Sequence, residues 1–314
     1  MSIPNDSWLP LPEEPLFVLA MDHRGSSAKA LPGSPSGQPH IGLSRMRQVK
    51  ALVYEGLCHI AGSIPVGREG VLADGASGAD VLRRAKSDGL VVLMPIEAPG
   101  SRVFELEHHD RFAEHIEAFD PDFLNALVRY NPLDDEGMRH TTITRLAAVS
   151  EWAARANRRW IIELLVPPTP GQQATHQNRH DFESAARSAL TAQAISQLQS
   201  GGIHPAAWML EGFERPDGAD EVLAVVAAER EHPAQCIVSG RDAPIDQVAE
   251  WLTLAAGRRF VGFAVGRAIW EEPAQRLLAG TLSSEGVIDA VAEAYSTLVD
   301  AFMRGSERSR AGPH

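Results

Sequence analysis

Short apolar runs alternate along this chain with longer segments of helical periodicity, and this alternation constrains the fold more than any other feature. The apolar runs cover residues 16–21, 70–73, 90–94, 124–130, 160–166, 207–210, 236–238 and 260–265. Most are continuous, as is typical of parallel strands that are buried on both faces. Eight strands, each followed by a helix, predict a (β/α)₈ TIM barrel. An open doubly wound sheet is the main alternative, but the chain has no early Gly-rich dinucleotide fingerprint.

The predicted helices cover residues 44–60, 77–87, 111–119, 137–157, 181–199, 220–229, 245–256, 273–279 and 284–304. A length of 314 residues allows one large or two small domains. Neither a dividing linker nor an internal repeat is visible. We therefore expect a single TIM-barrel domain over residues 1–314, with a core of about 15–280, a C-terminal helix at 284–304 and a frayed tail at 305–314.

Composition excludes several classes of protein. The formal net charge of −12 argues against nucleic-acid binding, because phosphate neutralisation needs clustered cations. The two cysteines fit a reducing compartment, and the first residues lack the basic and apolar regions of a secretory signal, so we expect a cytoplasmic protein. No apolar stretch is long enough to predict a membrane span. Only three cations are lysines: Lys29, Lys50 and Lys86.

Polar side chains follow the predicted strands at the end where TIM barrels carry out their chemistry. We take as candidate catalytic residues Asp22, Arg24, Arg129, Glu163 and Glu211. Any one of these could instead be solvated or ion-paired. Their convergence on one face of the barrel favours a functional site.

Glu163 is the most informative of these residues because it lies inside an otherwise apolar strand. A carboxylate there must face the barrel lumen or be buried and paired, since desolvating it alone is costly. Burial raises the pKa of a carboxyl group and makes it a candidate acid/base, whereas an ion pair with Arg129 is the structural alternative. Side chains alternate along a strand, so Met209 and Glu211 share one face and Trp208 and Leu210 the other.

The ends of the seventh and eighth strands combine small residues with arginines. TIM barrels often bind phosphate at these loops, where small residues let the ligand approach backbone amides. The candidate phosphate-binding residues are Ser239, Gly240, Arg241, Gly266 and Arg267. The alternative is a pair of tight turns with arginines that face solvent.

Metal and nucleophile motifs give little further direction. The chain has no His-Glu-x-x-His pattern and no paired cysteines, so zinc is not indicated. A carboxylate site for Mg²⁺ or Mn²⁺ remains open, with its residues unknown. Neither a Ser-centred nucleophile elbow nor a Walker loop occurs.

Several motifs together resemble one family. They are Asp22-His23-Arg24-Gly25, Arg129-Tyr130-Asn131-Pro132, the segment from Glu163 to Thr169, Trp208-Met209-Leu210-Glu211-Gly212 and Gly266-Arg267-Ala268-Ile269-Trp270. This set resembles the aldolase-like domain that also occurs fused to 5-dehydro-2-deoxygluconokinase and, more distantly, tagatose 1,6-bisphosphate aldolase. The similarity runs over residues 15–270.

The resemblance implies a class I aldolase-like barrel that acts on a small-molecule sugar phosphate, a phosphorylated ketose or keto-acid sugar, and that assembles as a homo-oligomer. It places the proton-transferring glutamate at Glu163. The Schiff-base lysine of the family falls on Met209, and a second active-site lysine falls on Asn125. Lys29 lies in the loop after the first strand and could substitute. Lys50 and Lys86 are expected to be solvated on outer helices.

Three functions are compatible with these residues. A carbon–carbon lyase of the aldolase type leads because of the family resemblance. A sugar-phosphate isomerase or epimerase would use the same groups through an enediol, with arginines or a divalent metal stabilising the charge. A barrel that binds sugar phosphates without turnover is the non-enzymatic alternative.

Overall fold

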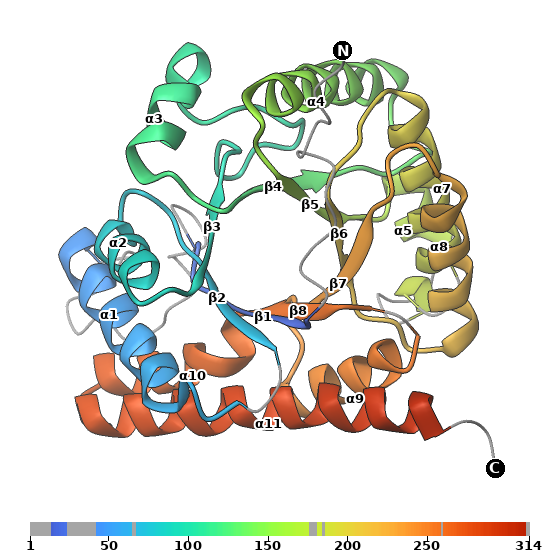
Figure 1. Cartoon of the computed structure of the whole chain (residues 1–314). Coiled ribbons are helices and arrows are strands. Elements are labelled where there is room, and N and C mark those ends of the chain that lie inside the picture. The colour runs from blue at the N-terminus through green and yellow to red at the C-terminus, as the bar shows by residue number, and fades with distance from the viewer. Residues whose placement is uncertain are drawn as a thin grey trace.

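The computed structural model describes residues 14–23, 42–64, 67–175, 181–183, 186–258 and 260–311. Within them, eight parallel strands close into a barrel in sequence order, which confirms the predicted (β/α)₈ fold (Figure 1). The strands are β1 (Leu16–Ala20), β2 (Arg68–Leu72), β3 (Val91–Pro95), β4 (Phe123–Arg129), β5 (Trp160–Leu165), β6 (Ala207–Glu211), β7 (Gln235–Ser239) and β8 (Gly262–Val265).

Helices surround the barrel, and the long C-terminal helix lies across one side of it (Figure 1). The helices within the described ranges are α1 (Leu43–Ile60), α2 (Ala79–Ser87), η3 (His109–Arg111), α3 (Phe112–Phe119), α4 (Glu136–Ala156), α5 (Pro170–Thr175), α7 (Arg187–Ser200), α8 (Pro216–Ala228), α9 (Ile245–Ala256), α10 (Arg267–Leu278) and α11 (Ser284–Ala311). Helix α11 packs against α1, α9 and α10.

Two of these helices differ from the sequence-based expectation. Helix α10 begins at Arg267, directly after β8, and not at residue 273, because Pro273 sits inside the helix instead of starting it. Helix α11 continues past residue 304 to Ala311, where a frayed tail was expected. Both differences lie at helix ends, which sequence patterns locate least well.

Side chains on the strands divide between the barrel lumen and the layer under the helices. The lumen is filled by apolar residues, among them Leu16, Val18, Leu72, Leu93, Phe123, Ile161, Ala207, Met209, Ile237 and Ala264. Trp208 and Leu210 belong to the core between sheet and helices. The predicted alternation along β6 is therefore confirmed for Trp208, Met209 and Leu210, with Met209 inside the barrel. No helix among the described residues is both long and apolar enough to cross a membrane.

Parallel pairing sets which side chains share a level in the lumen. Glu163 on β5 pairs with Leu127 on β4 and with Met209 on β6. Glu211 and Ser239, one step higher, pair across β6 and β7. The register therefore places the Glu163 carboxylate, the Met209 thioether and the Ser239 hydroxyl close together, towards the carboxyl end of the barrel.

Candidate functional site at the carboxyl end of the barrel

A cavity of about 200 Å³ opens at the carboxyl ends of the strands. Seven of the ten predicted site residues line it: Asp22, Arg129, Glu163, Ser239, Arg241, Gly266 and Arg267. His23, Glu97 and Met209 line it as well, although none was among the predicted set. Glu211 and Gly240 do not reach the cavity lining, and Arg24 and Lys29 lie outside the described residues. The structure therefore brings together groups from most strands of the barrel.

Glu163 is half-buried at the cavity wall, where its Oε1 accepts a hydrogen bond of 3.0 Å from the Ser239 hydroxyl. Burial among protein atoms, followed by the charge of Asp22, raises its pKa to about 8, and the Ser239 hydrogen bond opposes this shift only in part. Glu163 therefore holds a proton at neutral pH. A protonated carboxyl group facing a cavity can act as a general acid and can take the proton back later in a cycle.

The alternative role for Glu163, an ion pair with Arg129, does not occur within the described part of the chain. The Arg129 guanidinium donates instead to the Ser101 carbonyl at 3.5 Å, on the loop after β3. Both side chains remain directed at the cavity. Arg129 is thus available to a ligand, and no arginine among the described residues neutralises Glu163.

Arg241 reaches the cavity with its charge already balanced. Its guanidinium forms ion pairs with Glu183, at 2.7 Å, and with Glu211. Arg187, which is 3% exposed, also pairs with Glu183 and donates to the Glu211 carbonyl at 3.4 Å. Burial raises the pKa of Glu211, against the opposing charges of Arg187 and Arg241. Glu211 therefore holds Arg241 in place from behind and does not itself face the cavity.

The loops after β7 and β8 differ in the contacts that their backbone makes with neighbouring strands. The Gly240 amide donates to the Ala264 carbonyl at 3.2 Å, so it is engaged within the sheet. Gly266 precedes the first turn of α10 and packs so closely on β1 that an added Cβ would lie 2.2 Å from the Ala20 carbonyl oxygen. Arg267 then extends along the rim and forms an ion pair with Asp242. The loop after β8 thus leads directly into the start of a helix, and helix starts favour anions.

The sequence-based expectation that Lys50 is solvated is wrong. It is 1% exposed, not solvated, and it forms an ion pair with the equally buried Asp74 at the end of β2. Helix α1 buries Met46, Val49, Val53, Tyr54 and Leu57, and the same periodicity puts Lys50 on the buried stripe. That spacing was visible in the sequence. The partner at the end of a distant strand was not.

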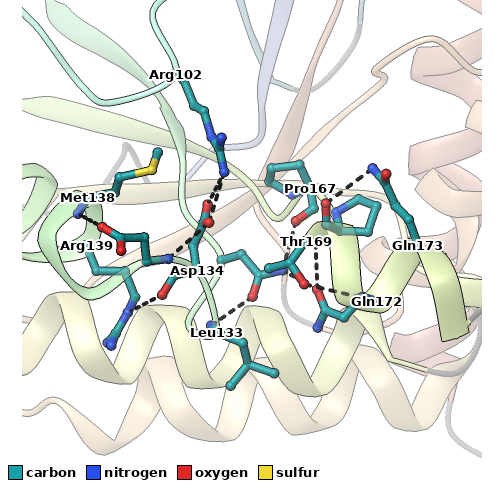
Figure 2. A network of polar contacts seen from close by, with 12 residues as sticks. Arg102, Leu133, Asp134, Met138, Arg139, Pro167, Thr169, Gln172 and Gln173 are labelled. Atoms are coloured by element: carbon teal, nitrogen blue, oxygen red, sulfur yellow. Dashed lines mark hydrogen bonds and ion pairs between the residues drawn. The ribbon is translucent and has the colours of Figure 1, made fainter.

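A polar network joins the loops after β3, β4 and β5 (Figure 2). Asn131 is buried, and its Nδ2 donates to the Pro167 carbonyl at 2.8 Å and to the Gln172 side chain at 2.7 Å. Arg102, after β3, donates to Asp134 at 3.0 Å. Asn131, which follows β4, thus has a structural role. The network ties the loop that follows Arg129 to its neighbours.

The acidic residues of the site do not form a compact metal centre. Within the described ranges, no three His, Cys, Asp or Glu side chains are grouped so that they could hold a metal ion. Asp22, Glu97 and Glu163 line the same cavity without meeting at one point. The described residues thus offer no ready-made site for a divalent metal.

The fold and this cavity define a (β/α)₈ barrel with a polar cavity at the carboxyl ends of its strands. The sequence matches, over residues 11–306, the family described as an uncharacterized protein conserved in bacteria (DUF2090), and the chain belongs to that family. A comparison with curated proteins gives no match.

Solved structures with the same fold include several aldolases. Cgl0159 from Corynebacterium glutamicum is 17% identical, with a TM-score of 0.56 over 94% of this chain and 87% of that one. Fructose-bisphosphate aldolase from Plasmodium falciparum is 9% identical, with a TM-score of 0.65 over 92% and 90%. Fructose-bisphosphate aldolase from Slackia heliotrinireducens is 13% identical, with a TM-score of 0.51 over 90% and 85%. At these identities the likeness establishes the fold alone.

Proposed function

We propose that this barrel is an aldolase-type carbon–carbon lyase acting on a phosphorylated ketose or keto-acid sugar. The observation that carries the proposal is Glu163, a carboxyl group with a pKa near 8 that faces a cavity with arginines at its rim. The solved neighbours include a Schiff-base-forming fructose-1,6-bisphosphate aldolase. In this chain Met209 occupies the lumen level of Glu163, so an amine from β6 is absent there.

In the proposed cleavage, two carboxyl groups of the protein carry out all the proton transfers. Glu163 donates its proton to the substrate carbonyl oxygen as the electrons of the breaking carbon–carbon bond move towards it, which forms an enediol. Asp22 accepts the proton from the hydroxyl group on the departing carbon, which leaves as an aldehyde. The enediol then takes that proton from Asp22 on carbon and returns its oxygen-bound proton to Glu163. Two carbonyl products form, and the protein returns to its starting state.

Phosphate recognition is assigned to Arg267 with the first turn of α10, supported by Gly266, Ser239, Gly240 and Arg241. Arg267 lines the cavity, and a helix start favours anions. Gly240 serves through close packing, since its amide is engaged and an added Cβ would lie 2.8 Å from the Val265 side chain. Arg241 adds positive charge while Glu183 and Glu211 fix its position.

Arg267→Leu tests this assignment. We expect the variant to bind fructose 1,6-bisphosphate or tagatose 1,6-bisphosphate at least about tenfold more weakly, because one charge-assisted contact to phosphate is lost. Affinity for the corresponding unphosphorylated ketose should not change. Isothermal titration calorimetry measures both, with Arg276→Leu as the control, since Arg276 lies exposed on the same helix and pairs with Glu272. Equal loss in both arginine variants would contradict the assignment.

A substrate screen tests the reaction itself. Wild-type protein is incubated with phosphorylated ketoses and keto-acid sugars, with and without Mg²⁺, Mn²⁺ or Zn²⁺, and the products are separated by chromatography and identified by mass spectrometry. Two smaller carbonyl fragments support the lyase. An isomer of unchanged mass would support an isomerase or epimerase, which the neighbouring Asp22 and Glu163 carboxyl groups also suit. Binding without any product would favour a sugar-phosphate-binding barrel.

Met209→Lys tests the position of the missing amine. Met209 is 1% exposed and lines the cavity at the level of Glu163, so a lysine there would meet the carbonyl group of a bound ketose. We expect the variant to form an imine with dihydroxyacetone phosphate, with loss of water, and borohydride to reduce it to a stable secondary amine. Mass spectrometry should find the adduct at residue 209 and none in wild type. Met138→Lys, at the start of α4, is the control, and an adduct there alone would contradict the placement.

A further inference from the structure

His23 shares the cavity with the proposed catalytic carboxyl groups. It follows Asp22 directly after β1, and both side chains line the cavity with Glu163. The proposed reaction gives His23 no task. Its position at the reacting end of the barrel nevertheless places an imidazole where a substrate would lie.

The ring and the backbone of His23 are both held in place. The ring contacts the edge of Trp270 on α10, with centroids 5.1 Å apart and planes at 81°. Trp270 is itself anchored, because its Nε1 donates to the Ala20 carbonyl on β1 at 2.9 Å. The His23 carbonyl accepts from the Lys50 ammonium at 3.5 Å, and Lys50 is fixed by Asp74. The imidazole thus has a defined orientation before any ligand arrives.

The surroundings keep this imidazole uncharged. Burial, helped by the positive charges of Arg267 and Lys50, lowers the pKa of His23 to about 4, although Asp22 and Asp74 act in the opposite direction. Its Nδ1 is shielded from solvent and makes no hydrogen bond within the described residues. A neutral imidazole carries one N–H donor and one lone pair, and because Nδ1 is shielded, the donor that can reach a ligand is an N–H on Nε2.

We propose that His23 is a further catalytic residue, a neutral imidazole whose N–H donates a hydrogen bond to the substrate carbonyl oxygen in the cavity it shares with Glu163. This inference rests on the proposed lyase function. A carbonyl oxygen has two lone pairs and can accept from His23 and Glu163 together. No proton leaves His23: the hydrogen bond strengthens as the carbonyl oxygen gains charge, which stabilises the transition state. His23 thus supplies the carbonyl polarisation that an imine would otherwise provide.

The direct test follows the ring nitrogens of His23 by NMR in protein labelled with ¹⁵N-histidine. We expect His23, assigned by its loss in His23→Gln, to remain neutral from pH 8 down to about 5. Saturating dihydroxyacetone phosphate should shift its ring signals, while inorganic phosphate leaves them in place and the signals of the distant His204 serve as a control. A ring that stays unchanged although dihydroxyacetone phosphate binds would overturn the inference and leave the proposed function standing. If dihydroxyacetone phosphate does not bind, the same comparison is made with the sugar phosphate that the wild type cleaves, and an unchanged His23 ring in that complex would overturn the inference while the lyase function stands.

Kinetics supply the second test, using the ketose phosphate that the wild type cleaves. His23→Leu should lower kcat about 100-fold with little change in KM, the effect of losing one donor to a developing oxyanion. His23→Gln keeps a donor and should recover part of that loss. Thermal unfolding of both variants shows that they are folded. If kcat equals the wild-type value in a folded His23→Leu, the inference is wrong.

Discussion

Glu163→Gln is expected to lower kcat for the ketose phosphate that the wild type cleaves by about 10³-fold. The affinity for this substrate should stay within a few-fold of the wild-type value. Glutamine keeps the size of the side chain and can still meet the Ser239 hydroxyl, which lies 3.0 Å from the carboxyl group. It cannot release or recover a proton. Steady-state kinetics and calorimetry on the same preparation separate the two effects. Glu117→Gln, on the exposed face of α3, is the control.

The same variant should be more stable than wild type at pH 8. The folded pKa of Glu163 is about 8, against an ordinary value of 4.5, so between these values the unfolded chain releases a proton that the folded protein retains. The contribution of Glu163 to the free energy of unfolding of the wild type is therefore fully present below pH 4.5. It falls as the pH rises to 8, by up to about 1.4 kcal/mol per pH unit. Glutamine has no such proton. A stability difference equal at pH 4 and pH 8 would contradict a raised pKa.

Lys50→Met is expected to destabilise the protein by about 3–5 kcal/mol. The variant leaves Asp74 as an uncompensated buried carboxylate, although the Ser77 hydroxyl and the amides of Ala76 and Ser77 still donate to it. Urea unfolding at pH 7 measures the loss. We also expect weaker activity, because Lys50 donates to the carbonyl of His23 beside the cavity.

The chain provides a matched control for this substitution. Lys86 also pairs with an aspartate, Asp120, but the two side chains are 43% and 57% exposed. Lys86→Met should therefore cost at most about 1 kcal/mol. Burial raises the pKa of Asp74, but the charge and hydrogen bonds of Lys50 and Ser77 lower it overall, so the stabilising pair is present at neutral pH and lost in acid. The Lys50→Met defect should accordingly shrink as the pH falls. Similar losses for the two lysine variants would contradict the burial of Lys50.

The inward direction of Glu163 could be predicted because strand alternation is a local rule. A carboxylate within an apolar parallel strand has few places to point, and the same rule placed Met209 in the lumen. Ser239, Gly266 and Arg267 were predictable for a related reason. Once the strands are counted, their carboxyl ends must meet at one end of the barrel.

Other features depend on partners far along the chain. Arg187 lies on the buried stripe of α7, but its contact with the Glu211 carbonyl, 24 residues further along, needed the folded chain. Likewise, Gly240 follows β7 as expected, yet its amide is taken by the Ala264 carbonyl on β8. Local patterns report periodicity and burial. They do not report which donor a given acceptor meets.

The amino-acid sequence by itself determined the barrel, its strand order and the carboxylate that faces the lumen, because hydrophobic periodicity acts over a few residues. Only the tertiary structure decided how charge is distributed around the cavity. It joined Lys50 to Asp74, enclosed Arg241 between Glu183 and Glu211, and placed His23 against Trp270. The physical reason is that desolvation and pairing depend on the whole surroundings of a group, which contacts between distant segments create.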